Sequence, residues 1–171
     1  MDSEEDQWIA FKSLEYFFFA GVNEYNELYR CAHEHCIIPW LVETNSLNIF
    51  DSTLEEKINS LIKNCWFCPV TDSLRINGFL HVTGIKGKSL RPDWLSLKDL
   101  GSVDKIEKYI RKHEISRLVL IEDFSGSGYQ ISRALKFAAE NLKIPILLVP
   151  LIICDQGDKT LEQLITSPDF S

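Results

Sequence analysis

The chain has 171 residues, 45% of them hydrophobic, which is enough for a single domain with a substantial core. Its formal net charge of -7 argues against broad binding of nucleic acids or membrane surfaces, because both depend on basic patches. The sequence contains no apolar run of about 18 residues and its N-terminus is acidic, unlike a secretory signal, so we expect a soluble cytoplasmic protein.

The N-terminal region, residues 1 to about 35, has the apolar periodicity of helices. The side chains that carry this pattern are Trp8, Phe11, Leu14, Phe18, Tyr25, Leu28 and Tyr29. The run Tyr16–Ala20 is too apolar to stay in water. We interpret it as core, and an interface with a second copy or a partner protein is the alternative.

Two further elements are expected before the first buried strand. Ile37–Val42 predicts a short strand, which Pro39 would place at an edge or a bend. Ser52 and Glu55 form a capping-box pattern ahead of a helix. The apolar face of that helix consists of Leu54, Ile58, Leu61 and Ile62.

A strand followed by a polar turn begins at Trp66. Trp66–Val70 predicts a strand, and Thr71 or Asp72 can cap the helix that follows. The turn offers Asp72, Ser73 and Arg75 to a ligand at the carboxyl end of the strand. The alternative is a helix cap beside a surface arginine.

The segment from Gly84 to Asp99 contains Gly, Ser and Pro residues at short intervals, which is typical of a loop. Such a loop could cover a crevice, with Arg91 or Lys88 meeting a phosphate and Trp94 stacking on a base. Packing of Trp94 against the domain is the alternative. A structural helix capped by Ser102 is expected next.

The most informative segment starts with the apolar run Leu118–Ile121, which is typical of a strand buried on both faces of a parallel sheet. Two carboxylates, Glu122 and Asp123, follow it and can bind ribose hydroxyls directly or through Mg²⁺. A helix is expected from about residue 127 to 141, and the apolar run Ile144–Ile153 completes a right-handed strand-helix-strand unit.

The loop that opens this helix suits a phosphate. Free backbone N–H groups and the positive end of the helix dipole favour an anion. Gly126 and Gly128 remove side chains that would block close approach, and Ser127 adds a hydroxyl donor. The alternative is an ordinary strand-to-helix turn in which Ser and Asp only cap the helix. Neither a Gly-x-Gly-x-x-Gly motif nor a P-loop motif is present in the sequence.

The segment Leu118–Gln130 resembles the signature of the phosphoribosyltransferases. In that signature hydrophobic residues lead into two acidic residues, and a Thr-Gly or Ser-Gly loop then binds the 5′-phosphate of phosphoribosyl pyrophosphate. The resemblance implies that Glu122 and Asp123 hold ribose hydroxyls or metal. The ligand-binding residues expected on this match and at the earlier turn are Glu122, Asp123, Phe124, Ser125, Gly126, Ser127, Gly128, Tyr129, Gln130, Asp72, Ser73 and Arg75.

The chain departs from the common form of that signature at three places. Gly126 stands where many purine enzymes carry an aspartate, Gln130 replaces the usual closing Thr, and the turn at residues 71–75 lacks an Arg-Gly-Gly form. A divergent phosphoribosyltransferase-like group found in bacterial conflict and anti-phage systems has a similar Glu-Asp-Phe-x-Gly-Ser-Gly-x-Gln segment. This group is the closest resemblance, and it implies a role in antiviral defence.

The cysteines and histidines suggest a second kind of site. Cys31, His33, His35 and Cys36, with Cys65 and Cys68, supply enough soft ligands for zinc. Their spacing is poor, because a Cys-x-x-Cys pair within a strand sends its sulfurs to opposite faces. Five cysteines, an odd number, also fit reduced thiols better than disulfides, and buried free thiols are the alternative to zinc.

These patterns predict an α/β fold, a mainly parallel sheet flanked by helices, with a helical N-terminal addition. We expect one domain over residues 1–171, with a helical part at 1–64 and an α/β core at 65–171, and a truncated C-terminus is one alternative for its short end. The predicted function is Mg²⁺-dependent binding of phosphoribosyl pyrophosphate or a related nucleotide. Phosphoribosyl transfer is the enzymatic version, and an inactive sensing or defence module is the alternative. No direct contact with nucleic acid or membrane is expected.

Overall fold

Three parallel strands form the sheet of the computed structural model, which describes residues 3–86 and 102–167. They are β1 (Cys65–Pro69), β2 (Arg117–Glu122) and β3 (Ile146–Pro150), in the spatial order β1-β2-β3. Their registers pair Phe67 with Val119 and Val119 with Leu147. All three predicted strands of the α/β core are therefore confirmed, and the acidic pair lies at the carboxyl end of the central one.

The helices account for most of the remaining described chain. They are α1 (Glu4–Ser13), the short 3₁₀ helix η1 (Leu14–Tyr16), α2 (Val22–Cys31), the π-helix η2 (Ala32–Ile37), α3 (Ile38–Thr44), α4 (Leu54–Lys63), α5 (Ile76–Val82), α7 (Val103–Lys112), α8 (Tyr129–Asn141) and α9 (Asp155–Ile165). None of the helices in residues 3–86 and 102–167 has both the length and the apolar character needed to cross a membrane.

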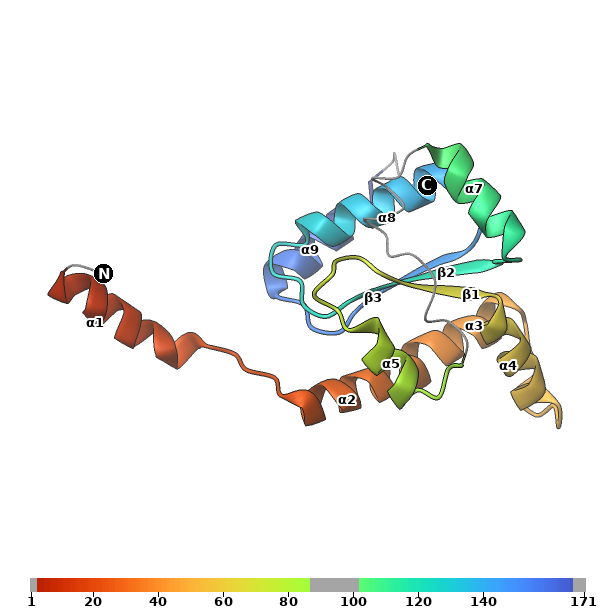
Figure 1. Ribbon diagram of the computed structural model, residues 1–171, viewed down its shortest axis with the longest axis horizontal. Coiled ribbons are helices and arrows are strands. Elements are labelled where there is room, and N and C mark those ends of the chain that lie inside the picture. The colour runs from red at the N-terminus through yellow and green to blue at the C-terminus, as the bar shows by residue number, and fades with distance from the viewer. Residues whose placement is uncertain (1–2, 87–101, 168–171) are drawn as a thin grey trace.

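Helices cover both faces of the sheet (Figure 1). Successive strand residues point to opposite faces, so each strand contributes to two apolar clusters. Phe67 and Val119 pack with Tyr29 of α2 and Phe79 of α5 on one face. The other face gathers Trp66, Leu118, Leu120, Ile106 of α7 and Ile131, Ala134 and Ala138 of α8. The expected α/β architecture is confirmed.

The N-terminal region corrects one prediction. The run Tyr16–Ala20 does not enter the core, since Tyr16, Phe17, Phe18 and Phe19 are 70 to 88% exposed. Both faces of the sheet are already covered by other helices, which leaves no core position for this run. It forms an extended connection between η1 and α2 (Figure 1).

The short strand predicted at Ile37–Val42 is wrong, because this segment continues from η2 into α3. Pro39 lies in the first turn of α3, where a residue without an N–H loses no helical hydrogen bond. Ile37 and Leu41 are both fully buried and are four residues apart, so they share one helical face. The segment is apolar, as predicted, but its buried residues recur with the spacing of a helix and not of a strand.

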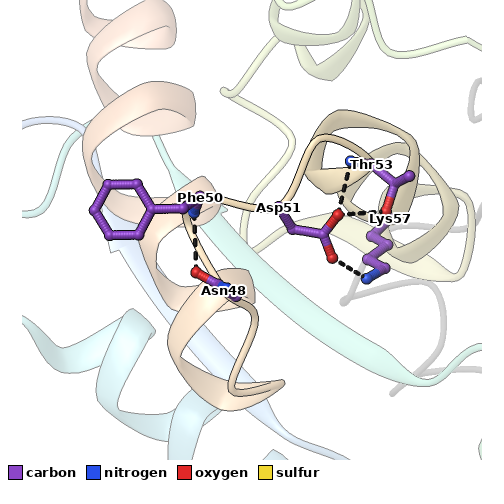
Figure 2. Close-up of polar contacts among 5 residues, drawn as sticks. All are labelled: Asn48, Phe50, Asp51, Thr53 and Lys57. Carbon is purple, nitrogen blue, oxygen red and sulfur yellow. Dashed lines mark hydrogen bonds and ion pairs between the residues drawn. The ribbon is translucent and has the colours of Figure 1, made fainter.

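The start of α4 differs from the predicted capping box. Asp51 accepts hydrogen bonds from the N–H and the hydroxyl of Thr53, each at 2.8 Å, and forms an ion pair with Lys57 (Figure 2). The hydrogen-bonded contact with Lys57, followed by the hydrogen bonds from Thr53, lowers the pKa of Asp51 well below its ordinary range. Asp51 therefore supplies the polar contacts that Ser52 and Glu55 were expected to make. In the same turn Asn48 accepts a hydrogen bond from the N–H of Phe50 at 3.0 Å.

The loop predicted between Gly84 and Asp99 falls largely outside the described residues. Lys88, Arg91 and Trp94 belong to that part, and their expected contacts with phosphate and base stay predictions.

Candidate ligand-binding site

Two polar turns leave the sheet at the same edge, because β1 and β2 are parallel neighbours. Residues 71–75 connect β1 to α5, and residues 123–128 connect β2 to α8. The N–H of Val70 donates to the carbonyl of Ile121 at 2.9 Å, so the strand pairing continues to the point where the turns begin. The two turns, which the sequence predicted as separate candidate ligand-binding segments, thus lie side by side.

Glu122 is buried and holds the first of these turns. One of its carboxyl oxygens accepts from the N–H of Thr71 at 3.0 Å, and the other accepts from the Thr71 hydroxyl at 2.7 Å. The side chain is only 2% exposed, and this burial raises the pKa of Glu122. Thr71 was expected as a helix cap, but α5 begins only at Ile76, and Thr71 instead pairs with this carboxyl. Glu122 points toward the turn.

Asp123 contacts the same turn from a more open position. Its Oδ1 accepts from the Ser73 hydroxyl at 2.9 Å and from the N–H of Phe124 at 2.8 Å. The hydroxyls of Ser73 and Thr71 are 2.7 Å apart, and each donates its single proton to a carboxyl group, Ser73 to Asp123 and Thr71 to Glu122, so the two acidic side chains contact the same turn. Within the described residues the second oxygen, Oδ2, has no hydrogen bond. As far as residues 3–86 and 102–167 show, Asp123 has one carboxylate oxygen that is open to a ligand.

A pocket of about 510 Å³ opens beside Asp123. Its lining residues are Phe19, Ala20, Gly21, Val22, Tyr25, Asn26, Tyr29, Ser73, Arg75, Gly78 and Asp123. Burial and the charge of Asp123 raise the pKa values of Tyr25 and Tyr29. Arg75 is exposed and makes no ion pair with any described residue. The pocket thus brings together a guanidinium, an acidic group and two phenols, whereas Asp72 is exposed and is not part of its lining.

The loop after Asp123 is fixed to the end of β3. The N–H of Ser125 donates to the carbonyl of Ile152, and the carbonyl of Ser125 accepts from the N–H of Cys154, both at 2.9 Å. Ser125 is buried, so its backbone is structural. Gly128 follows at the N-cap of α8 with a φ of 78°, a left-handed conformation that favours glycine.

The first turns of α9 pack against this loop. An added Cβ at Gly157 would lie 2.9 Å from the carbonyl oxygen of Gly126, and one at Gly128 would lie 2.8 Å from the carbonyl oxygen of Gly157. The hydroxyl of Thr160 shares its one proton between the carbonyl of Gln156 in its own helix, at 2.7 Å, and the carbonyl of Ser127 in the loop, at 2.9 Å. Two glycines and a threonine therefore allow a close contact that holds the loop in place.

The open side of the loop presents backbone donors. The first hydrogen bond within α8 joins the N–H of Ser132 to the carbonyl of Gly128 at 2.9 Å. The N–H groups of Gly126, Ser127 and Gln130 have no partner among the described residues, as expected around a helix N-terminus. Ser127, Tyr129, Gln130 and Phe124 are exposed. Residues 125–130 do not line the pocket beside Asp123, so the loop is a surface adjacent to it.

The sequence predicted two kinds of metal site, a zinc site of Cys and His residues and a Mg²⁺ site at Glu122 and Asp123. In residues 3–86 and 102–167 no group of three or more His, Cys, Asp or Glu side chains could hold a metal ion. Cys65 and Cys68 are buried in β1 while Cys31 and Cys36 are exposed, which separates the suggested zinc ligands. Mg²⁺ needs fewer protein ligands, since it commonly binds one or two carboxylates together with phosphates and water. Asp123 fits that requirement, whereas both oxygens of Glu122 are occupied by Thr71.

Several residues of the site were not identified from the sequence. Tyr25 and Tyr29 were assigned to an apolar helical face, and Asn26 was not considered. Gly157 and Thr160 were also missed, although a glycine inside a helical pattern is a signal of close packing. These residues come from α2 and α9, far in sequence from the motif, so only the fold brings them to it.

Comparison with known proteins identifies the family. The family model PRTase-CE matches residues 1–170. No curated protein and no solved structure matches the chain. The small parallel sheet flanked by helices is consistent with this family match. The chain belongs to PRTase-CE, a phosphoribosyltransferase-like family.

Proposed function

We propose that this phosphoribosyltransferase-like domain binds phosphoribosyl pyrophosphate, or a related nucleotide, at the carboxyl edge of its sheet. The observation that carries the proposal is the contact between the two polar turns. Ser73 donates to Asp123 at 2.9 Å, beside a pocket that is also lined by Arg75. A ligand at this edge would meet hydroxyls, a carboxylate oxygen and a cation within one concave surface.

The ligand groups are assigned by charge and hydrogen-bonding capacity. The 5′-phosphate binds the free N–H groups of Gly126, Ser127 and Gln130, with the Ser127 hydroxyl as a further donor. Asp123 accepts from the ribose hydroxyls through its free Oδ2. The pyrophosphate group lies toward Ser73 and Arg75, since a guanidinium binds phosphate oxygens well.

Mg²⁺ is expected with the ligand. Asp123 supplies one carboxylate oxygen, and phosphate oxygens and water complete the shell. Glu122 stays buried and holds Thr71, so its contribution is to position the turn. When bound, the metal would stabilise the negative charge on the pyrophosphate.

Phosphoribosyl transfer is the enzymatic version of this function. In that reaction the bond from ribose C1 to the pyrophosphate oxygen breaks, pyrophosphate leaves with the bonding electrons, and an acceptor atom bonds to C1. The second candidate is a sensing or defence module that binds the same ligand without transfer. One observation favours it: the N–H of Thr71 donates to Glu122 at 3.0 Å, so a backbone donor of this turn is already occupied.

Thermal unfolding with and without phosphoribosyl pyrophosphate tests binding, because a ligand of the folded state raises its stability in proportion to RT ln(1 + [L]/Kd). We expect a higher melting temperature with ligand and Mg²⁺, and a smaller increase with EDTA. Asp123→Asn should remove the metal dependence, and Ser127→Ala should weaken binding in both conditions. Equal stabilisation of all three proteins would contradict the proposed site.

A matched control uses Ser125, the other serine of the same loop. Ser125 is buried and bonded through its backbone, so Ser125→Ala should leave ligand binding close to wild type. Release of pyrophosphate in the presence of a panel of nucleobases separates the two versions of the function. Stabilisation with pyrophosphate release indicates transfer, and stabilisation without release indicates sensing.

A further inference from the structure

A second pocket, of about 710 Å³, adjoins the pocket beside Asp123. The two pockets share Phe19, Ala20 and Tyr25 in their linings, so they form one continuous depression. Most of the second lining is aromatic, and we call it the aromatic pocket. Its rings are Tyr16, Phe18, Phe19, Tyr25 and Phe124.

The aromatic pocket reaches the strand end that carries the Ser/Gly loop. Phe124 follows Asp123 directly, and its N–H donates to Oδ1 of Asp123 at 2.8 Å. Ile152 and Cys154 also line the pocket, and their backbones hold Ser125 through hydrogen bonds of 2.9 Å each. A ligand with its ribose at Asp123 and its phosphate at residues 126–130 would therefore have the ring of Phe124 directly beside its sugar.

The rings of the aromatic pocket are accessible to a ligand. Tyr16, Phe18 and Phe19 are 70 to 88% exposed, and Phe124 is 46% exposed. Any nucleobase can stack on such rings, because every base has a π face. The volume of the pocket lies within the range of small-molecule sites, roughly 300–1,000 Å³. The pocket thus suits a planar group attached to the ribose.

The turn at residues 71–75 is less well suited to a pyrophosphate. Together with the adjoining strand end, residues 122–123, it contains one cation, Arg75, and three carboxylates, Asp72, Glu122 and Asp123. Phosphate groups beside carboxylates are destabilised by the repulsion of like charges. The N–H of Thr71, a donor that a phosphate could use, already bonds to Glu122 at 3.0 Å. A ligand with a single phosphate at the Ser/Gly loop avoids this turn.

We propose that the preferred ligand is a nucleoside 5′-monophosphate whose base lies in the aromatic pocket, an inference that rests on the proposed function. The phosphate binds the N–H groups of the loop, and Asp123 accepts from the ribose hydroxyls. The base stacks against Phe18 and Phe124. Compared with phosphoribosyl pyrophosphate, this ligand lacks the pyrophosphate that the acidic turn disfavours and gains a base that the aromatic rings can cover.

Isothermal titration calorimetry of the full chain with Mg²⁺ tests the proposal. The ligands are ribose 5-phosphate, phosphoribosyl pyrophosphate and the 5′-monophosphates of adenosine, guanosine, cytidine and uridine. We expect at least one nucleotide to bind about tenfold more tightly than ribose 5-phosphate, since stacking of a base contributes about this much, and more tightly than phosphoribosyl pyrophosphate. Phe18→Ala and Phe124→Ala should each remove most of this advantage. Phe18→Ala should leave the affinity for ribose 5-phosphate unchanged, because that ligand has no base.

Phe17→Ala is the matched control. Phe17 and Phe18 are neighbours in the same connection and are 72% and 70% exposed, but only Phe18 lines the aromatic pocket. Phe17→Ala should therefore bind the nucleotide as wild type does. Tighter binding of phosphoribosyl pyrophosphate than of all four nucleotides would overturn this inference alone. So would a nucleotide advantage that survives both Phe18→Ala and Phe124→Ala, or one that Phe17→Ala removes equally. If none of the six ligands binds, the proposed function fails as well.

Discussion

Replacement of Gly128 by alanine tests whether the Ser/Gly loop is held by its fit against α9. Gly128 has a φ of 78°, and a left-handed backbone costs an L-residue roughly 1–2 kcal/mol. The added Cβ would also lie 2.8 Å from the Gly157 carbonyl oxygen and 3.0 Å from its Cα. Overpacking against such atoms costs roughly 1–3 kcal/mol. We expect Gly128→Ala to lower the free energy of unfolding by about 2–5 kcal/mol.

Urea denaturation measures this loss, and Gly126→Ala provides the comparison within the same loop. An alanine at Gly126 meets only a ring carbon of Phe124, at 3.7 Å, and the backbone φ there is not positive. Its stability should stay within about 0.5 kcal/mol of wild type. If the phosphate approaches the loop backbone closely, Gly126→Ala should nevertheless weaken binding of phosphoribosyl pyrophosphate. Equal stabilities for the two variants would refute the reasoning about the α9 contact.

Three further changes probe the site and its support. Burial raises the pKa of Glu122, so its stabilising contribution is present below the ordinary value of 4.5 and is lost as pH rises through the folded-state pKa. Glu122→Gln should therefore gain stability over wild type as pH rises above 4.5, measured by urea unfolding; a difference independent of pH would contradict this. Thr160→Val removes the donor to the Ser127 carbonyl and should cost about 1 kcal/mol in the same assay, whereas no loss would exclude that support. Asp51→Ala should reduce hydrogen-exchange protection at the start of α4, and unchanged protection would show that its bonds to Thr53 are dispensable.

The strands and the helix after the motif could be predicted because their signals are local. Leu118–Ile121 is a continuous apolar run, and the strand built on it is buried on both faces. Gly128 marked the start of α8, where it adopts a conformation that few other residues tolerate. The segment Ile37–Val42 shows where local signals mislead, because a short apolar run with one proline fits an edge strand and a helix start equally well.

The side-chain partners of the motif could not be predicted in the same way. Thr71 and Glu122 are 51 positions apart, and their pairing depends on β1 and β2 being adjacent. The contact between Gly128 and Gly157 requires α9 to return beneath the loop. One wall of the pocket comes from α2, whose Tyr25 and Tyr29 have the spacing of an ordinary apolar helix face in the sequence. In each case the residue type was visible, but its role follows from long-range packing.

The two carboxylates of the motif have separate roles for a physical reason. Glu122 is the last residue of β2 and is buried, whereas Asp123 begins the turn after the strand and is partly exposed, so only Asp123 can meet a ligand at the open edge. Glu122 is buried, and a buried carboxylate needs hydrogen bonds to offset its desolvation; Thr71 supplies them through both its N–H and its hydroxyl. That pairing fixes the turn which carries Ser73, and Ser73 in turn orients Asp123 at 2.9 Å. The acidic pair is therefore one binding carboxylate and one positioning carboxyl, and a change at Glu122 should affect ligand binding through the geometry of Ser73 and Asp123.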